Sequence, residues 1–135
     1  MKKEEMSGIS NSEIRKIRSL SSKKFRDEYG LFTVEGEKMV AEALASEFVV
    51  EKVYRTDEIG KEAMSRISSL SSPSPVLALV RRPDSPVLES EEAAAAALGS
   101  GLYIALDSIR DPGNLGTILR IADWFGADAV FASPD

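Results

Sequence analysis

Arg120 and Trp124 are the residues of this sequence best suited to contacting a ligand at a surface. Residues 115–125 are expected to form a helix. Because a helix advances about 100° per residue, five apolar side chains of this segment lie on one face: Leu115, Ile118, Leu119, Ala122 and Phe125. Arg120 falls nearly opposite that face, with Thr117 three residues before it and Trp124 four residues after it. One interpretation is a solvated arginine beside a tryptophan, joined by a cation–π contact. The other is a cation directed at a ligand or a second subunit, because large aromatic side chains rarely lie in open water.

The residues around this helix predict a βαβ unit. Apolar runs at 102–106 and 129–132 flank a helix over 115–125, and this order is typical of two parallel strands joined by a crossover helix. Ligands gather at the carboxyl ends of such strands, where the Asp111-Pro112-Gly113-Asn114 loop must lie. The loop is also explained by turn formation, with Asn114 as a helix cap, and it lacks the glycine patterns of phosphate-binding loops.

The composition excludes several classes of site. The chain has 135 residues, 43% of them hydrophobic and 29% charged, which suits a globular protein. It contains no cysteine and no histidine, so it has no disulfide framework, no thiolate nucleophile and no imidazole general base or metal ligand. No apolar run is long enough to span a membrane, and residues 1–5 lack the apolar core of a signal peptide. We expect a cytoplasmic protein without a metal.

The net charge of −5 is unevenly distributed along the chain. Residues 1–83 carry 15 Lys and Arg against 13 Asp and Glu, whereas residues 84–135 carry 2 against 9. Basic residues therefore belong to the first part. A local basic face can bind phosphate even in an acidic chain, because salt confines each field to about 10 Å.

The first part of the chain predicts a small α/β layered domain that ends near residue 83. Segments typical of strands alternate with segments typical of helices. We expect strands at 31–35, 48–54 and 76–80, and helices from near 13, at 37–45 and at 60–70. Met39 and Met64 fall at apolar helical positions and are expected to fill the core rather than bind a cofactor.

The first helical segment is strongly basic. Its charged residues include Arg15, Lys16, Arg18, Lys23, Lys24 and Arg26. An RNA-facing surface is one interpretation, and an ordinary solvated helix face is the other.

Residues 84–101 are expected to link two domains. They contain an acidic cluster, five consecutive alanines that favour a short helix, and Gly99-Ser100-Gly101. The predicted domains are therefore 1–83 and 102–135.

The helix region resembles a known family. The pattern Asp111-Pro112-x-Asn114-x-Gly116-x-Ile118-x-Arg120-x-Ala122, followed by Phe125-Gly126, resembles the first signature motif of the SpoU-type RNA ribose 2′-O-methyltransferases, in the SPOUT superfamily. Lys23-Lys24-x-Arg26 and the stretch 34–44 are similar to that family's substrate-binding domain. The resemblance implies an α/β/α RNA-binding domain, then the first βαβ unit of a truncated trefoil-knot domain.

The resemblance also implies roles and partners. It places Asn114 and Arg120 in the active site, and it makes Lys23, Lys24 and Arg26 candidates for binding RNA, with ribosomal RNA favoured over transfer RNA. It implies S-adenosylmethionine as the methyl donor and a homodimer for the full-length protein. The later motifs that hold the donor are not in this sequence, so we expect this chain alone to lack the cofactor pocket and turnover. A stand-alone RNA-binding module and a nucleotide-binding α/β fragment unrelated to RNA are the alternative hypotheses.

Overall fold

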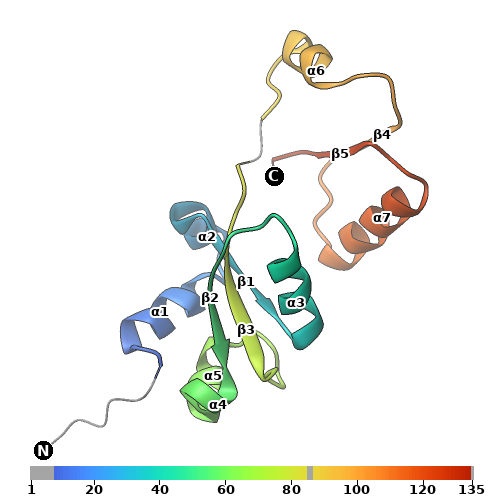
Figure 1. The fold of residues 1–135 in the computed structure, drawn as a ribbon. Coiled ribbons are helices and arrows are strands. Elements are labelled where there is room, and N and C mark those ends of the chain that lie inside the picture. Colours follow the sequence, from blue (N-terminus) through green and yellow to red (C-terminus); the bar gives the residue numbers. More distant parts are fainter. Residues whose placement is uncertain (1–7, 85–86, 135) are drawn as a thin grey trace, which may run out of the picture. The chain divides into compact units, whose positions relative to one another are not determined.

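The chain forms two compact units. The computed structural model describes residues 8–84 and 87–134, and the division falls between Met1–Ser85 and Pro86–Asp135 (Figure 1). Parts of the predicted regions, at 1–7, 85–86 and 135, lie outside the described residues.

The N-terminal unit is built on a three-stranded antiparallel sheet. Its strands are β1 (Leu31–Glu35), β2 (Val50–Arg55) and β3 (Val76–Arg81), in the order β1-β3-β2. The central strand β3 is the most apolar of the three, and its residues 76–80 are all buried. A central strand is covered on both faces, so a continuous apolar run is what its position requires.

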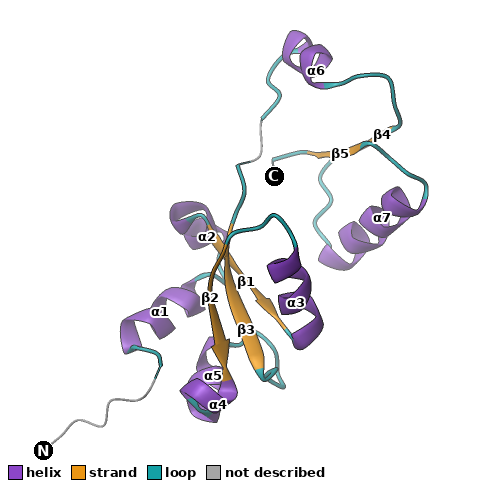
Figure 2. Cartoon of the chain, in the orientation of Figure 1, coloured by secondary structure: helices purple, strands orange, loops and turns teal. Residues whose placement is uncertain are grey.

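Helices cover both faces of this sheet, which confirms the predicted α/β/α arrangement (Figure 2). The alternation of β3 side chains defines the two sides. Leu77 and Leu79 pack with α1 (Asn11–Ser19), α4 (Thr56–Ile59) and α5 (Lys61–Ile67). Val76, Ala78 and Val80 pack on the other face with Val40 of α3 (Glu37–Ala45).

The start of α1 is tied to the sheet through Glu13. Ser10 caps the helix and forms a reciprocal capping box with Glu13. The Glu13 carboxylate also accepts hydrogen bonds from Lys52, at 2.9 Å, and from the Tyr54 hydroxyl, at 3.3 Å. The Lys52 hydrogen bond, with that from the Ser10 backbone, lowers the pKa of Glu13 to about 2. Burial, together with the Glu13 charge, raises the pKa of Tyr54 to about 12.

Several predictions for this unit were wrong in detail. The basic segment is two helices, α1 and α2 (Lys23–Tyr29). The helix expected over 60–70 is α5, at 61–67, and the short helix α4 before it was not predicted; Gly60, whose φ is 87°, separates the two. A residue with that φ interrupts a helix. Met64 is buried as predicted, but Met39 of α3 is 50% exposed. Helix α3 is the one described helix on its face of the sheet, so no neighbouring helix covers Met39.

The C-terminal unit contains the predicted βαβ arrangement. Strands β4 (Tyr103–Leu106) and β5 (Ala129–Ala132) are parallel, and α7 (Pro112–Trp124) connects them. The alanine run forms α6 (Glu91–Ala97), with Ser90 as its cap. No helix in the described part of the chain is both long and apolar enough to cross a bilayer.

Helix α7 begins earlier than predicted. The expected loop at 111–114 is mostly the first helical turn: Asp111 is the N-cap, and its carboxylate accepts hydrogen bonds from the backbone N–H groups of Gly113 and Asn114. Pro112 suits the first position of a helix, since the N–H that it lacks would have no helical partner there. Asp111, not Asn114, therefore caps the helix.

Only part of the predicted core face of α7 is covered. Leu115 and Ile118 are half-buried and Ala122 is buried, but Leu119 is 46% exposed and Phe125 is 71% exposed. The prediction for these last two residues was wrong, because a two-stranded sheet is too narrow to cover a five-residue stripe. Ala122 is the single fully buried residue among those described in this unit.

Candidate functional site

Asn114 and Arg120 both lie on α7 and are both exposed. Asn114 is in the first turn, and Arg120 is six residues further on, about 9 Å along the helix axis. Helical side chains lean toward the N-terminus, so the Arg120 side chain leans toward the end of the helix that carries Asn114. Arg120 has no ion-pair or hydrogen-bond partner within the described residues, and a guanidinium in that state can bind an anion.

Trp124 does not make the cation–π contact that one interpretation required. It is 85% exposed, and the lysines at 16, 24 and 52 make the cation–π contacts found in the described parts of the chain. The tryptophan is therefore available to a ligand or another protein surface.

Gly116 lies on the exposed side of α7. A Cβ built at this position has no described atom within 4 Å. The fold of this chain therefore does not itself require a glycine here, although a close approach by a ligand would.

The three basic residues expected to bind RNA are already engaged to different degrees. The Arg26 guanidinium donates to the carbonyl oxygens of Leu20 and Ser21, both at 2.9 Å, and so closes the end of α1. Lys23 pairs with Asp27 at 3.0 Å. The Lys24 ammonium lies 5.5 Å from the centroid of the Phe25 ring.

Asp27 joins this basic segment to the end of β3. Its carboxylate accepts hydrogen bonds from Arg82 and Lys23, which hold the pKa of Asp27 below its usual range. The charge of Lys23 is consequently partly compensated within the unit.

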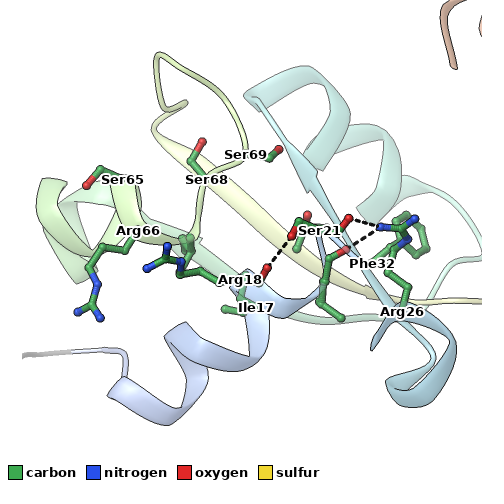
Figure 3. Close-up of a pocket in the computed structure, with 12 residues that line it drawn as sticks. Ile17, Arg18, Ser21, Arg26, Phe32, Ser65, Arg66, Ser68 and Ser69 are labelled. Atoms are coloured by element: carbon green, nitrogen blue, oxygen red, sulfur yellow. Dashed lines mark hydrogen bonds between the residues drawn. The ribbon is translucent and has the colours of Figure 1, made fainter. Parts of the chain in front are cut away.

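Arg66, on α5, is a candidate that sequence reasoning missed. It lines the same cavity as Arg18 of α1 and Arg26 of α2 (Figure 3). The sequence contains no signal for this grouping, because α5 lies more than forty residues after α1 and only packing brings the two helices together.

Comparison with known proteins covers both units. Residues 11–77 match the MRM3-like substrate binding domain. The chain is 27% identical to RlmP of Bacillus subtilis, the 23S rRNA (guanosine(2553)-2′-O)-methyltransferase, over 89% of this chain and 50% of that protein. It is 30% identical to the mitochondrial rRNA methyltransferase 3 of Xenopus tropicalis, over 81% of this chain and 30% of that protein.

A solved structure shares the fold. The AdoMet-bound rRNA methyltransferase from Sinorhizobium meliloti superposes with a TM-score of 0.74 at 28% identity, over 96% of this chain and 54% of that one. The chain thus spans about half the length of RlmP and of this structure. It contains an MRM3-like substrate-binding domain and is a homologue of the SpoU/TrmH-family rRNA 2′-O-methyltransferases, the family that its motifs resemble.

Proposed function

We propose that the whole protein transfers a methyl group from S-adenosylmethionine to a ribose 2′-hydroxyl of RNA, and that this RNA is ribosomal RNA. The observation that carries this proposal is an exposed Asn114 together with an Arg120 that has no partner among the described residues, both on α7, in a chain whose similarity to rRNA 2′-O-methyltransferases runs through both units. Because these relatives are enzymes, neither a stand-alone RNA-binding module nor an α/β fragment unrelated to RNA is favoured.

The chemistry assigns Arg120 an electrostatic role. The 2′-hydroxyl loses its proton as it attacks, so negative charge grows on its oxygen. A guanidinium stays protonated at ordinary pH and is a poor base, but it can orient the hydroxyl or a neighbouring phosphate and stabilise the developing alkoxide. Asn114 offers both donors and an acceptor, which suits positioning the ribose or Arg120 itself.

The methyl donor belongs to this proposal for the whole protein. S-adenosylmethionine carries a sulfonium-bound methyl group, and the solved relative from Sinorhizobium meliloti binds it. Residues 87–134 bury only Ala122 completely, so they do not enclose a pocket for the donor by themselves. In this proposal, the groups that these residues contribute contact the RNA substrate rather than the methyl donor.

The domains divide the work in our proposal. Residues 1–83 form the RNA-binding domain, and residues 84–101 link it to the second domain. Residues 102–135 begin that second domain and contribute Asn114 and Arg120 to the active site. Lys23, Lys24 and Arg26 are the proposed RNA contacts of the first domain. Lys24 is the most available of the three, because Lys23 is ion-paired and Arg26 holds the end of α1.

We also propose a homodimer for the whole protein. Helix α7 and the residue that follows it leave four large apolar side chains at least 46% exposed: Leu119, Ile121, Trp124 and Phe125. Apolar surface of this kind is typical of an interface. A cytoplasmic location is part of the same proposal, although curated relatives include mitochondrial enzymes.

Methyl transfer to ribosomal RNA tests the function. Arg120→Ala in the whole protein is expected to lower kcat by about 100-fold, as loss of one group that stabilises a developing oxyanion does elsewhere. Asn114→Ala is expected to lower kcat by a smaller factor. Arg15→Ala is the control, because it removes one exposed positive charge from α1 and reports the effect of charge alone on RNA capture. An Arg120→Ala enzyme with unchanged kcat would refute the assigned role.

A further inference from the structure

A cleft in the N-terminal unit combines cations with hydroxyl groups. It has a volume of about 640 Å³ and lies between the end of α1, the start of α2, strand β1 and α5. Six of its lining residues define the serine–arginine cleft: Arg18, Ser21, Arg26, Ser65, Arg66 and Ser69. Figure 3 shows that they come from both sides of the cleft.

The cleft carries an excess of positive charge, although the Glu35 carboxylate accepts hydrogen bonds from two of its lining residues, Ser68 and Ser69. No carboxylate is among its lining residues, and neither Arg18 nor Arg66 has an ion-pair or hydrogen-bond partner in the described parts of the chain. Arg26 contributes a third charge whose position is fixed by the two backbone carbonyls it holds. Arginine donates along two parallel N–H directions, a geometry that matches the oxygens of a phosphate.

Three serine hydroxyls of the cleft already donate their protons within the unit. Ser21 donates its proton to the carbonyl oxygen of Arg18, at 3.0 Å, and Ser65 donates to that of Glu62, at 2.7 Å. Ser69 donates to the Glu35 carboxylate at 3.0 Å. A hydroxyl that has used its proton still presents lone pairs, so it can accept a hydrogen bond from a ligand that donates. A ribose 2′-hydroxyl is such a donor, and deoxyribose lacks it.

We infer that the serine–arginine cleft binds the sugar–phosphate backbone of an RNA strand. Arg18 and Arg66 contact phosphates, and the serine oxygens accept from ribose hydroxyls. This inference rests on the proposed function, since it names the place where the substrate-binding domain holds its RNA. It makes the cleft, rather than Lys23 with its ion pair, the main electrostatic contact.

Charge reversal with a matched control tests the arginines. The 135-residue chain carrying Arg18→Glu and Arg66→Glu is compared with the chain carrying Arg15→Glu and Lys61→Glu. Both pairs change the same total charge on the same two helices, but Arg15 and Lys61 do not line the cleft. Binding to a single-stranded ribosomal RNA oligonucleotide is measured over a range of salt concentrations, with circular dichroism to verify folding.

The cleft pair is expected to weaken RNA binding at least tenfold more than the control pair. The slope of log affinity against log salt should fall by about 0.7 for each phosphate that the cleft no longer neutralises. Equal losses of RNA affinity in the two double variants would refute the cleft as the binding site. They would leave intact the proposal that this domain binds RNA. A wild-type chain that binds no RNA would overturn both the cleft and the proposed RNA substrate.

The serines are tested by comparing RNA with DNA of the same sequence. Ser21→Ala with Ser65→Ala changes no charge, and it is expected to reduce the preference for RNA at least threefold. Ser19→Ala is the control, because Ser19 also donates to a carbonyl of its own helix, that of Lys16, but does not line the cleft. An RNA preference that survives the double substitution would overturn the ribose contacts.

Discussion

The two units of the chain differ in how completely they bury their apolar residues. The N-terminal unit has two buried clusters, one on each face of its sheet, and they include all of residues 76–80. The described C-terminal unit buries Ala122 fully and leaves Trp124 85% exposed. A sheet of three strands between helices can enclose side chains on both faces, whereas two strands and one helix cannot. The first unit therefore encloses a core of its own, whereas the described part of the second leaves apolar side chains exposed.

Truncation of one leucine in each unit should give the largest contrast. Leu77 is fully buried, so Leu77→Ala is expected to lower the free energy of unfolding by about 2–5 kcal/mol, through lost burial and a cavity. Leu119 is 46% exposed, so Leu119→Ala should cost less than about 1 kcal/mol. Denaturant unfolding of the two variants measures the difference. Equal losses would mean that α7 is as well packed as β3.

Removal of the N-cap of α7 should have the next largest effect on stability. Asp111→Ala removes the acceptor for two backbone N–H groups and should destabilise the helix by about 1 kcal/mol. Amide hydrogen exchange should rise along α7 while the exchange of β3 stays unchanged. Asp111→Asn keeps an accepting oxygen and serves as the control. Protection lost equally in both units would contradict the separate stability of the two.

Gly116 should respond in the opposite direction. Gly116→Ala adds a methyl group to open space and improves helix propensity, so α7 is expected to gain about 1 kcal/mol. In the whole protein the same substitution should lower methyl transfer, if a ligand approaches this side of α7 as we propose. Hydrogen exchange measures the first effect, and kcat with KM measures the second. A variant that is stabilised and fully active would show that nothing approaches Gly116 closely.

The smallest effect concerns pH and the N-terminal unit. The pKa of Glu13 falls from 4.5 to about 2 on folding, so its stabilising contribution is complete above about pH 4.5. It is lost as pH falls from there toward 2, because the unfolded chain then binds the proton more readily. Glu13→Gln should cost less than about 1 kcal/mol at pH 7, given that the pair with Lys52 is partly exposed.

The difference between wild type and Glu13→Gln should shrink as the pH is lowered through that window. Unfolding measured at several pH values checks this. A difference that does not change with pH would show that the hydrogen bond from Lys52 is not what lowers the pKa of Glu13.

Local signals in the sequence predicted most of the elements correctly. Strand β1, helix α3 and strand β5 have the predicted bounds, and β4 and β5 are parallel as expected. The errors fall where local signals are ambiguous. Pro112, Gly113 and Asn114 suit a turn, yet they also suit the first turn of a helix once Asp111 caps it. The short helix α4 was not predicted, because four residues are too few to show a helical repeat.

Three features can be read directly from the residues: the family motif on α7, the basic character of the first segment, and the alternation of strands and helices. These depend on residue types at fixed spacing, which a linear chain displays directly. The tertiary structure, in contrast, is needed to show which of those residues are free to contact a ligand. It engaged Arg26 with backbone carbonyls and Lys23 with Asp27, and it brought Arg18 and Arg66 to one cleft. It also left Leu119 and Phe125 uncovered on a face that periodicity had assigned to the core. The physical reason is that periodicity fixes the face of a helix, whereas only packing against distant segments fixes what covers that face.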